Sequence, residues 1–112
     1  KIKEKLPNTP IVLHGASSVI PSLVDMCNSN GGNIPGAKGC PDEMLKQAGE
    51  NGVSKINVDT DLRLAMTANI RRVFNEDPSV FDPRKYLGAA RDSIKETVAQ
   101  KINDVFCSAN KA

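Results

Sequence analysis

Two short apolar segments, each followed by amphipathic helical patterns, constrain the fold of this chain more than any other feature of its sequence. Residues 11–13, Ile-Val-Leu, form a run typical of a buried strand. Residues 53–59 alternate apolar and polar side chains with the two-residue period of a strand. Strands that alternate with helices pair in parallel through helical crossovers. The sequence therefore predicts an α/β fold with two parallel strands.

Four amphipathic helices are predicted around these strands. They span about residues 21–30, 41–50 and 61–74, and the fourth follows residue 84, whereas the Gly- and Pro-rich residues 33–40 predict a loop. The predicted inward faces are Leu23, Val24 and Cys27; Met44, Leu45 and Ala48; Leu62, Met66, Ile70, Val73 and Phe74; and Leu87, Ile94, Val98, Ile102, Val105 and Phe106. The stripe on the last helix predicts that this helix docks on an apolar surface.

The predicted elements do not add up to a closed domain. Two parallel strands cannot cover four amphipathic helices, and both edges of a lone pair stay open. A (β/α)₈ barrel needs about 250 residues, and two of its eight strands are roughly a quarter of it. The chain also begins, at Lys1, within a charged, helix-like stretch without an initiator methionine. We therefore expect it to be part of a larger α/β sheet or barrel, cut from a longer protein.

Composition excludes several classes of protein. No run approaches the roughly 20 apolar residues of a membrane-spanning helix. The net charge is only +2, and one Tyr, three Phe and no Trp offer little for bases to stack on, so neither a membrane nor a nucleic acid is an expected partner. Three cysteines without a CxxC pair indicate free thiols in a reducing compartment. With no secretory signal legible, we expect a cytoplasmic location.

The end of the first strand carries the first candidate site. In α/β folds, functional residues lie at the carboxyl ends of strands. His14 stands at that end, where its imidazole suits a zinc ion, although a lone histidine is also a common structural residue. Any partner ligands must come from outside this chain. The following Gly-Ala-Ser-Ser turn, residues 15–18, lets backbone N–H groups approach an anion, but such turns are frequent.

The end of the second strand repeats this design. Asn57 and Asp59 project to one side of the predicted strand, and buried polar groups of this kind need polar partners or a ligand. Thr60 and Asp61 begin the next helix; either Thr60 or Asp61 could serve simply as its cap, and this is compatible with phosphate binding, since a helix N-terminus also attracts anions. Arg63 is one turn further on, either solvated or paired with a second phosphate or carboxylate.

Three motifs in order carry a resemblance to a known family. VLHGASS is followed by KINVDTDLRLAMTANIR and then by FDPRKYL, with SANK near the C-terminus. Together they closely resemble class II fructose-1,6-bisphosphate aldolases, most nearly the small-loop subgroup that carries GASS and DTDLR. The resemblance covers essentially the whole chain. The family fold is a TIM barrel, which implies that residues 1–112 are the C-terminal quarter of one barrel domain: its last two strands, their helices and the closing C-terminal helices.

The resemblance also implies an activity. Family enzymes are zinc-dependent aldehyde-lyases of glycolysis and gluconeogenesis. They cleave fructose 1,6-bisphosphate reversibly into dihydroxyacetone phosphate and glyceraldehyde 3-phosphate, with Zn²⁺ in place of a lysine Schiff base. A monovalent cation, Na⁺ or K⁺, is implied near the backbone carbonyls of the two turns. The other zinc ligands and the catalytic acid/base aspartate of the family lie upstream, so the isolated segment is predicted to be inactive.

Roles carried over by motif follow from the same resemblance. His14 corresponds to one of three zinc ligands, and Asn57 to the residue that hydrogen-bonds the enediolate oxygen. The phosphate of the dihydroxyacetone half is held by Gly15, Ser17, Asp59 and Thr60, and the other phosphate by Arg63, Asp82 and Arg84. Because Asp82 and Arg84 reach across from a neighbouring subunit in the family, a homodimer or homotetramer is implied. From local sequence alone, Arg84 is equally well a loop surface charge.

Alternatives remain open at this point. Tagatose-1,6-bisphosphate aldolase is a close relative with similar motifs, and a non-catalytic phosphate-binding or assembly module is the rival from another class. The sequence also departs from the family pattern, because Val19 and Ile20 precede Pro21 where one residue is usual. That insertion predicts a small shift in the start of the following helix.

Overall fold

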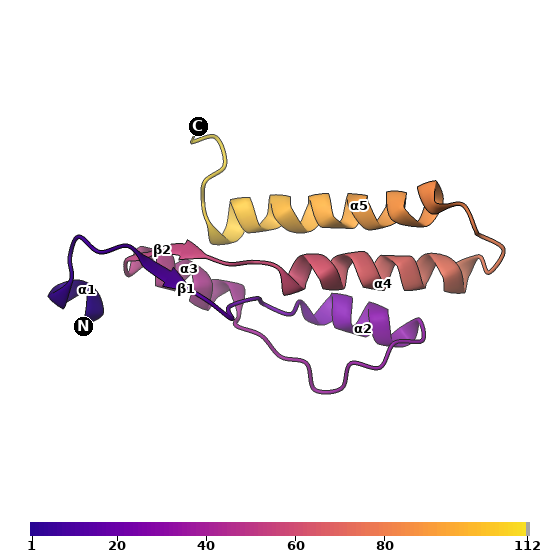
Figure 1. Cartoon of the computed structure of the whole chain (residues 1–112), viewed down its shortest axis with the longest axis horizontal. Coiled ribbons are helices and arrows are strands. Elements are labelled where there is room, and N and C mark those ends of the chain that lie inside the picture. Colours follow the sequence, from indigo (N-terminus) through magenta and orange to yellow (C-terminus); the bar gives the residue numbers. More distant parts are fainter. Residues whose placement is uncertain (112) are drawn as a thin grey trace.

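The computed structural model describes residues 1–111 and shows an α/β chain built on one pair of parallel strands (Figure 1). The elements are α1 (Ile2–Lys5), β1 (Ile11–Leu13), α2 (Pro21–Ser29), α3 (Asp42–Glu50), β2 (Val53–Ile56), α4 (Thr60–Glu76), α5 (Pro83–Gln100) and the π-helical turn η1 (Lys101–Val105). Leu13 pairs with Ile56 at the end of the parallel ladder. The predicted α/β class and parallel pairing are therefore confirmed.

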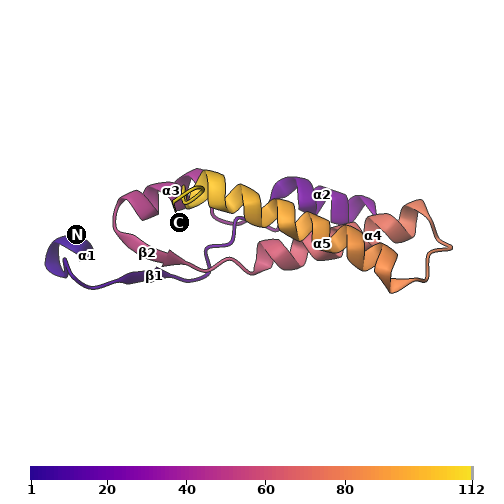
Figure 2. The same cartoon turned by 90° about the horizontal axis from the view of Figure 1, so that it is seen from above.

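The molecule is elongated. It measures 58 × 34 × 17 Å and has a radius of gyration of 16.8 Å, against about 13 Å for a compact domain of this length. Helices α2, α4 and α5 lie side by side along the long axis, and the strands and α3 occupy the other end (Figures 1 and 2). Val12, at the centre of β1, is consequently exposed. The prediction of a buried first strand was wrong for residues 1–111. In them β1 pairs with β2 alone, so the sheet has no further strand to bury it.

Two small hydrophobic clusters hold the elements together. Helices α2 and α4 share the first, which contains Val24, Cys27, Leu64 and Ala68. The second joins the turn after β1 to α3 and η1 through Ala16, Leu45 and Val105. This second cluster fixes the turn that follows His14 against the C-terminal end of the chain.

The buried face of α4 differs from the predicted one. Its buried residues are Asp61, Leu64, Ala65, Ala68 and Asn69. The predicted face lies toward solvent, with Met66 and Phe74 exposed and Leu62, Ile70 and Val73 half-buried. Alanines let α4 approach its neighbours because they add little bulk, so Ala65 and Ala68, together with Leu64, mark the contact face. The prediction for this helix was wrong.

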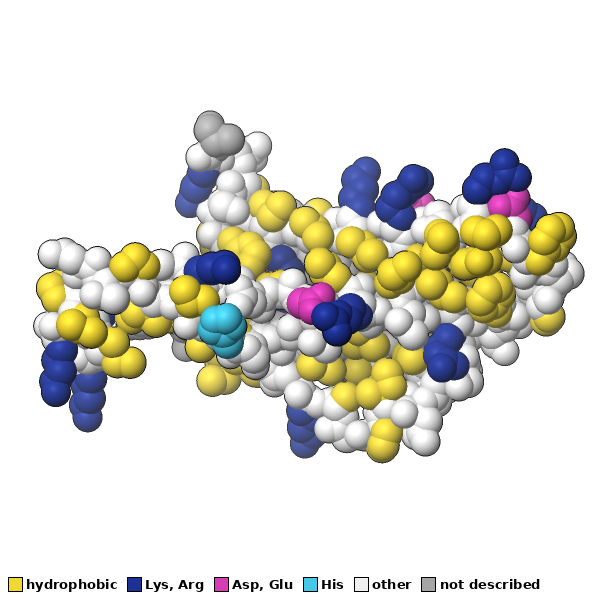
Figure 3. Space-filling model, viewed as in Figure 1, with side chains coloured by type: hydrophobic (Ala, Val, Ile, Leu, Met, Phe, Trp, Pro, Cys, Tyr) yellow, Lys and Arg dark blue, Asp and Glu magenta, His cyan; other side chains and the backbone are white. Residues whose placement is uncertain are grey.

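The same correction applies to α5 and α3. In the C-terminal helices, Ala90, Thr97, Lys101 and Val105 are buried. Of the predicted stripe only Val105 is buried; Ile94 is half-buried, and Leu87, Val98, Ile102 and Phe106 are exposed. On α3, Leu45 is fully buried but Met44 is 58% exposed. Figure 3 shows the hydrophobic side chains left uncovered along α4 and α5.

The boundaries near the strand ends also need one correction. Strand β2 ends at Ile56, so residues 57–59 form an irregular connection to α4 in place of the predicted end of a strand. The predicted stop of α2 at Gly31-Gly32 is confirmed, because the Gly32 N–H donates to the Cys27 carbonyl at 2.8 Å. A side chain at Gly32 has no room there, since its Cβ would lie 2.5 Å from that oxygen.

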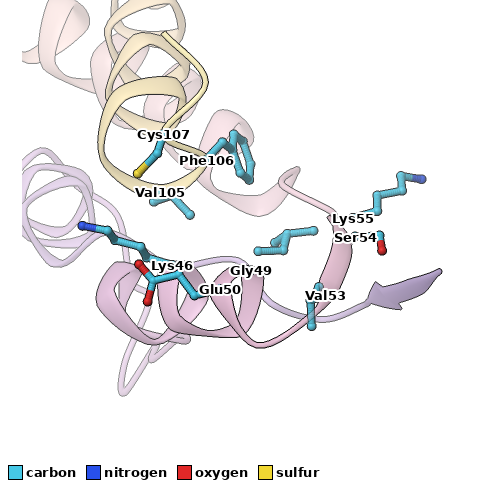
Figure 4. Close-up of a pocket in the computed structure, with 10 residues that line it drawn as sticks. Lys46, Gly49, Glu50, Val53, Ser54, Lys55, Val105, Phe106 and Cys107 are labelled. Atoms are coloured by element: carbon cyan, nitrogen blue, oxygen red, sulfur yellow. The ribbon is translucent and has the colours of Figure 1, made fainter. Parts of the chain in front are cut away.

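One hollow lies away from the predicted site residues. It has a volume of about 590 Å³ and is walled by α3, β2 and the end of η1 (Figure 4). Its lining is mainly apolar and includes Ile56, Val105 and Phe106. Within residues 1–111, every helix is too short or too polar to cross a membrane.

Candidate functional site

The two strand ends bring His14 and Asn57 into contact. The Asn57 N–H donates to the Leu13 carbonyl at 3.3 Å, which continues the parallel pairing by one step. The Asn57 amide nitrogen then lies 2.9 Å from Nδ1 of His14. When Nδ1 accepts this hydrogen bond in a neutral imidazole, the ring proton is on Nε2. The structure therefore places a histidine and a carboxamide together at the carboxyl edge of the strand pair.

Asp59 and Arg63 form an ion pair beside this contact. Nε of Arg63 donates to Asp59 Oδ1 at 3.1 Å, and its Nη2 to the second carboxylate oxygen. Both side chains are more than half exposed, so the pair is readily exchanged for another partner. The Asp59 side chain makes no capping bond to α4. An anion that binds at the start of α4 can therefore replace Asp59 as the partner of Arg63.

The Gly-Ala-Ser-Ser turn faces the start of α4. Gly15 has a φ of +63°, a conformation that glycine adopts without strain. The Cys40 N–H donates to the Ser17 carbonyl at 3.1 Å, so the loop of residues 33–40 closes against the turn. Gly39 is required at this crossing, because a Cβ there would lie 2.3 Å from the Ser17 oxygen. A hollow of about 320 Å³ beside this loop is lined in part by Thr60, Arg63 and Lys38.

Asp61 connects the two strand ends. Its carboxylate accepts the N–H of Ser18 at 3.0 Å and the N–H of Val19 at 2.6 Å, and the side chain is fully buried. The cap alternative for Asp61 was wrong, because this carboxylate binds the opposite turn. Val19 has a φ of +50°, which is strained for a β-branched residue. The unusual backbone at Val19 accommodates the extra residue before Pro21, and α2 begins at Pro21.

The buried side chain of Lys101 contacts the Gly-Ala-Ser-Ser turn, and the sequence analysis did not identify it. Nζ of Lys101 lies 2.6 Å from Ser18 Oγ, 2.5 Å from Asp42 Oδ1 and 3.3 Å from Asp61 Oδ2. Only 2% of Lys101 is exposed, and Gln100 Nε2 donates to Asp42 at 2.7 Å. We call Ser18, Asp42, Asp61 and Lys101 the latch. The sequence signal was a lysine within the predicted apolar stripe of the last helix, three residues after Val98 and four before Val105.

Acid is expected to weaken the fold through Asp42. Burial raises the pKa of this carboxyl, but hydrogen bonds from Lys101, Ser18 and Gln100 outweigh that effect and hold the pKa below its ordinary value of 3.8. Between the lowered pKa of the folded chain and the ordinary value, the unfolded chain binds more protons at Asp42 than the folded chain does. The free energy of unfolding therefore rises with pH in this range. The contribution is complete above about pH 4 and is lost as the pH falls through the lowered value.

Denaturant unfolding of the full-length protein between pH 5 and pH 2.5 measures this contribution. The Asp42→Asn variant is expected to show a flatter dependence of unfolding free energy on pH than the wild type. Equal slopes in the two proteins contradict the role given to Asp42.

Asp82 and Arg84 lie at the other end of the molecule. The Asp82 carboxylate caps α5 by accepting the Arg84 N–H at 2.9 Å, and it pairs with the Arg84 guanidinium at 2.6 Å. Hydrogen bonds from the side chain and backbone of Arg84 lower the pKa of Asp82. The connection that precedes α5 is far from the strands (Figure 1). Within one copy of residues 1–111, these two residues are not brought to His14.

His14 is the residue of this chain best suited to a metal ion. It ends the strand next to a carboxamide, and an imidazole nitrogen is a donor that zinc prefers. Because Nδ1 accepts from Asn57 when Nε2 carries the proton, zinc at Nε2 requires the proton to move to Nδ1 and the Asn57 amide to turn its oxygen toward it. Residues 1–111 contain no group of three or more His, Cys, Asp and Glu side chains placed to hold a metal. Within these residues, His14 alone does not make up a metal site. Cys27, Cys40 and Cys107 are free thiols.

The structure is thus an α/β chain whose two parallel strands carry polar side chains at their carboxyl ends. Residues 1–111 match the family "Fructose-bisphosphate aldolase class-II". The chain is 48% identical over 112 residues to a fructose-bisphosphate aldolase of Treponema pallidum and 50% identical over 107 residues to one of Giardia intestinalis. It is 47% identical over 108 residues to one of Thermus caldophilus.

The chain therefore belongs to the class II fructose-bisphosphate aldolase family. These alignments cover 100%, 96% and 96% of the chain but only 34%, 33% and 35% of the relatives. The chain thus spans about a third of the length of the curated relatives it matches.

Proposed function

We propose that residues 1–112 are the C-terminal part of one TIM-barrel domain of a fructose-1,6-bisphosphate aldolase, and that they supply the last two strands. The observation that carries this proposal is the contact between His14 and Asn57 at 2.9 Å, with the Ser17 turn and the start of α4 on either side. Family membership supports the reaction, which is reversible aldol cleavage to dihydroxyacetone phosphate and glyceraldehyde 3-phosphate.

The substrate phosphate of the dihydroxyacetone half is bound between the two strand ends. Gly15 and Ser17 donate from one side, and Asp59 and Thr60 donate backbone N–H groups from the first turn of α4. The positive end of the α4 dipole adds to this attraction. Because this phosphate does not react, its binding energy orients the carbons that do.

Asn57 acts where negative charge develops. Its amide donates a hydrogen bond to the oxygen of the enediolate, and the parallel pairing of β1 and β2 fixes its position beforehand. His14 would be one of three ligands of a zinc ion, with the other two and the acid/base aspartate supplied by the rest of the protein. When bound, zinc supplies a Lewis acid for the ketone oxygen. Backbone carbonyls of the two turns would hold Na⁺ or K⁺.

Arg63 binds the second phosphate, and its ion pair with Asp59 breaks when the substrate binds. Asp82 and Arg84 join it from a neighbouring subunit, since their own chain holds them at its far end (Figure 1). This assignment makes the active protein a homodimer or homotetramer. The free thiols suit a reducing compartment, and we place the protein in the cytoplasm, in glycolysis and gluconeogenesis.

The full-length protein is expected to cleave fructose 1,6-bisphosphate and to lose that activity when a chelator removes its metal. Added Zn²⁺ should restore the activity, because the family uses the metal in place of a Schiff base. Elemental analysis and a coupled assay for triose phosphate measure both effects. The isolated chain of residues 1–112 should show no cleavage, since it carries one zinc ligand.

Three outcomes contradict parts of this proposal. Faster cleavage of tagatose 1,6-bisphosphate assigns the protein to the epimeric sugar. Binding of phosphosugars without metal or cleavage favours a non-catalytic phosphate-binding module. Cleavage by the isolated chain removes the need for ligands from outside it.

A further inference from the structure

We propose that Lys101 is a positioning residue for substrate phosphate, which it serves by holding the Ser17–Ser18 turn at a fixed distance from the start of α4. This inference rests on the proposed function, because it concerns how that phosphate site is kept in shape. Lys101 itself is 2% exposed, so it acts through the latch and not by touching the substrate.

The contacts of Lys101 join every element that bounds the phosphate site. Its ammonium meets Ser18 in the turn after β1, Asp42 in the first turn of α3 and Asp61 in the first turn of α4. Asp61 in turn accepts two backbone N–H groups from the Gly-Ala-Ser-Ser turn and its successor. One side chain from the C-terminal end of the chain thus fixes both halves of the site.

Charge explains why the latch needs a lysine. Asp61 is fully buried and Asp42 is half-buried, and two carboxylates that share one partner repel each other unless a cation lies between them. Without the ammonium, that repulsion weakens the hydrogen bonds of the Asp61 carboxylate to the N–H groups of Ser18 and Val19, and the turn is held less firmly at the start of α4.

The backbone departs from regular geometry at both ends of the latch. Lys101 begins the π-helical turn η1, and π-helical turns are frequent at functional sites. Val19, whose N–H donates to Asp61, has a φ of +50°.

The Lys101→Met substitution in the full-length enzyme tests the inference. Methionine keeps the length and the apolar stem but removes the charge. We expect KM for fructose 1,6-bisphosphate and Kd for dihydroxyacetone phosphate to rise about tenfold, which corresponds to losing one charge-assisted hydrogen bond. We expect kcat to change less than twofold, because the phosphate is bound equally in ground and transition states.

The matched control is Lys95→Met, which removes an exposed lysine from the same helix and should leave KM, kcat and Kd unchanged. Zinc content should be the same in all three proteins. Should the Lys101→Met protein fail to fold, the Ser18→Ala protein carries the test, since it removes the latch's direct bond to the turn. Its KM should rise about threefold.

The outcomes separate the two proposals. A wild-type enzyme that cleaves substrate, together with a folded Lys101→Met protein of unchanged Kd, overturns the role of Lys101 alone. If the Lys101→Met protein is unfolded, an unchanged KM in the Ser18→Ala protein likewise overturns the role of Lys101 alone. A wild-type protein that neither cleaves fructose 1,6-bisphosphate nor binds dihydroxyacetone phosphate overturns the proposed function, and the role of Lys101 falls with it.

Discussion

Replacing Asn57 with alanine in the full-length protein is expected to lower kcat for aldol cleavage by about 10²–10³, with a much smaller change in KM. This is the usual loss when one preorganised donor to a developing oxyanion is removed. The amide of Asn57 is already oriented in the free chain, since its backbone N–H is bound to Leu13 and its side chain lies 2.9 Å from His14. Steady-state kinetics with fructose 1,6-bisphosphate measures the change.

Two further variants show whether the lost hydrogen bond is the cause. Asn57→Asp keeps the shape but replaces the donor with a negative charge, so kcat should fall at least as far as in Asn57→Ala. Asn103→Ala removes an exposed asparagine from η1 and should leave kcat unchanged. If Asn57→Ala lowers zinc content in proportion to kcat, Asn57 acts by orienting His14, and its role as a donor to the substrate is wrong.

That polar groups from both strands lie at one edge of the sheet was predictable from periodicity and topology. An apolar run, an alternating run and helices between them indicate parallel strands, and the carboxyl ends of parallel strands lie at one edge. The contact between His14 and Asn57 itself depends on the register, in which Leu13 pairs with Ile56, and the sequence analysis had placed Asn57 within the second strand. The helix stop at Gly31-Gly32 was predictable for a similar reason, since it depends on local backbone geometry.

The packing faces of α4 and α5 were not predictable from the size of their hydrophobic residues. The sequence analysis took Met66 and Leu87 as inward because they lie on apolar stripes at helical spacing, whereas Ala65, Ala68 and Ala90 are the buried residues. Alanine counts as apolar wherever it occurs in a helix, so its position says little about which face is buried. Which of two apolar faces is covered depends on the neighbouring elements, and a periodic pattern does not contain that information.

The latch was missed for a different reason. Lysine is almost never fully buried unless it is paired, so Lys101 was left out of the stripe on which it lies. Its partners Ser18, Asp42 and Asp61 come from three distant segments, and their approach follows only from the assembled fold. Asp61 was interpreted as a helix cap because that is the commonest role of an acidic residue in the first turn.

Replacing Asp61 with alanine is expected to lower the free energy of unfolding of the full-length protein by about 3–5 kcal/mol, the usual cost of removing one partner of a buried ion pair. The substitution leaves the N–H groups of Ser18 and Val19 without their acceptor and takes one of two carboxylates from Lys101. Urea unfolding measures the loss. Asp25→Ala, at an exposed position on α2, is the matched control and should change stability by less than about 0.5 kcal/mol.

A double substitution shows that charge, and not only lost packing, causes this effect. In Asp61→Ala combined with Lys101→Met, the ammonium and one carboxylate leave together, and Asp42 keeps its bonds to Ser18 and Gln100. The combined loss should therefore be smaller than the sum of the two single losses by about 0.5–3 kcal/mol, the range found for residues in direct contact. Strictly additive losses contradict a shared ion pair, because they require Asp61 and Lys101 to stabilise the fold independently although their atoms are 3.3 Å apart.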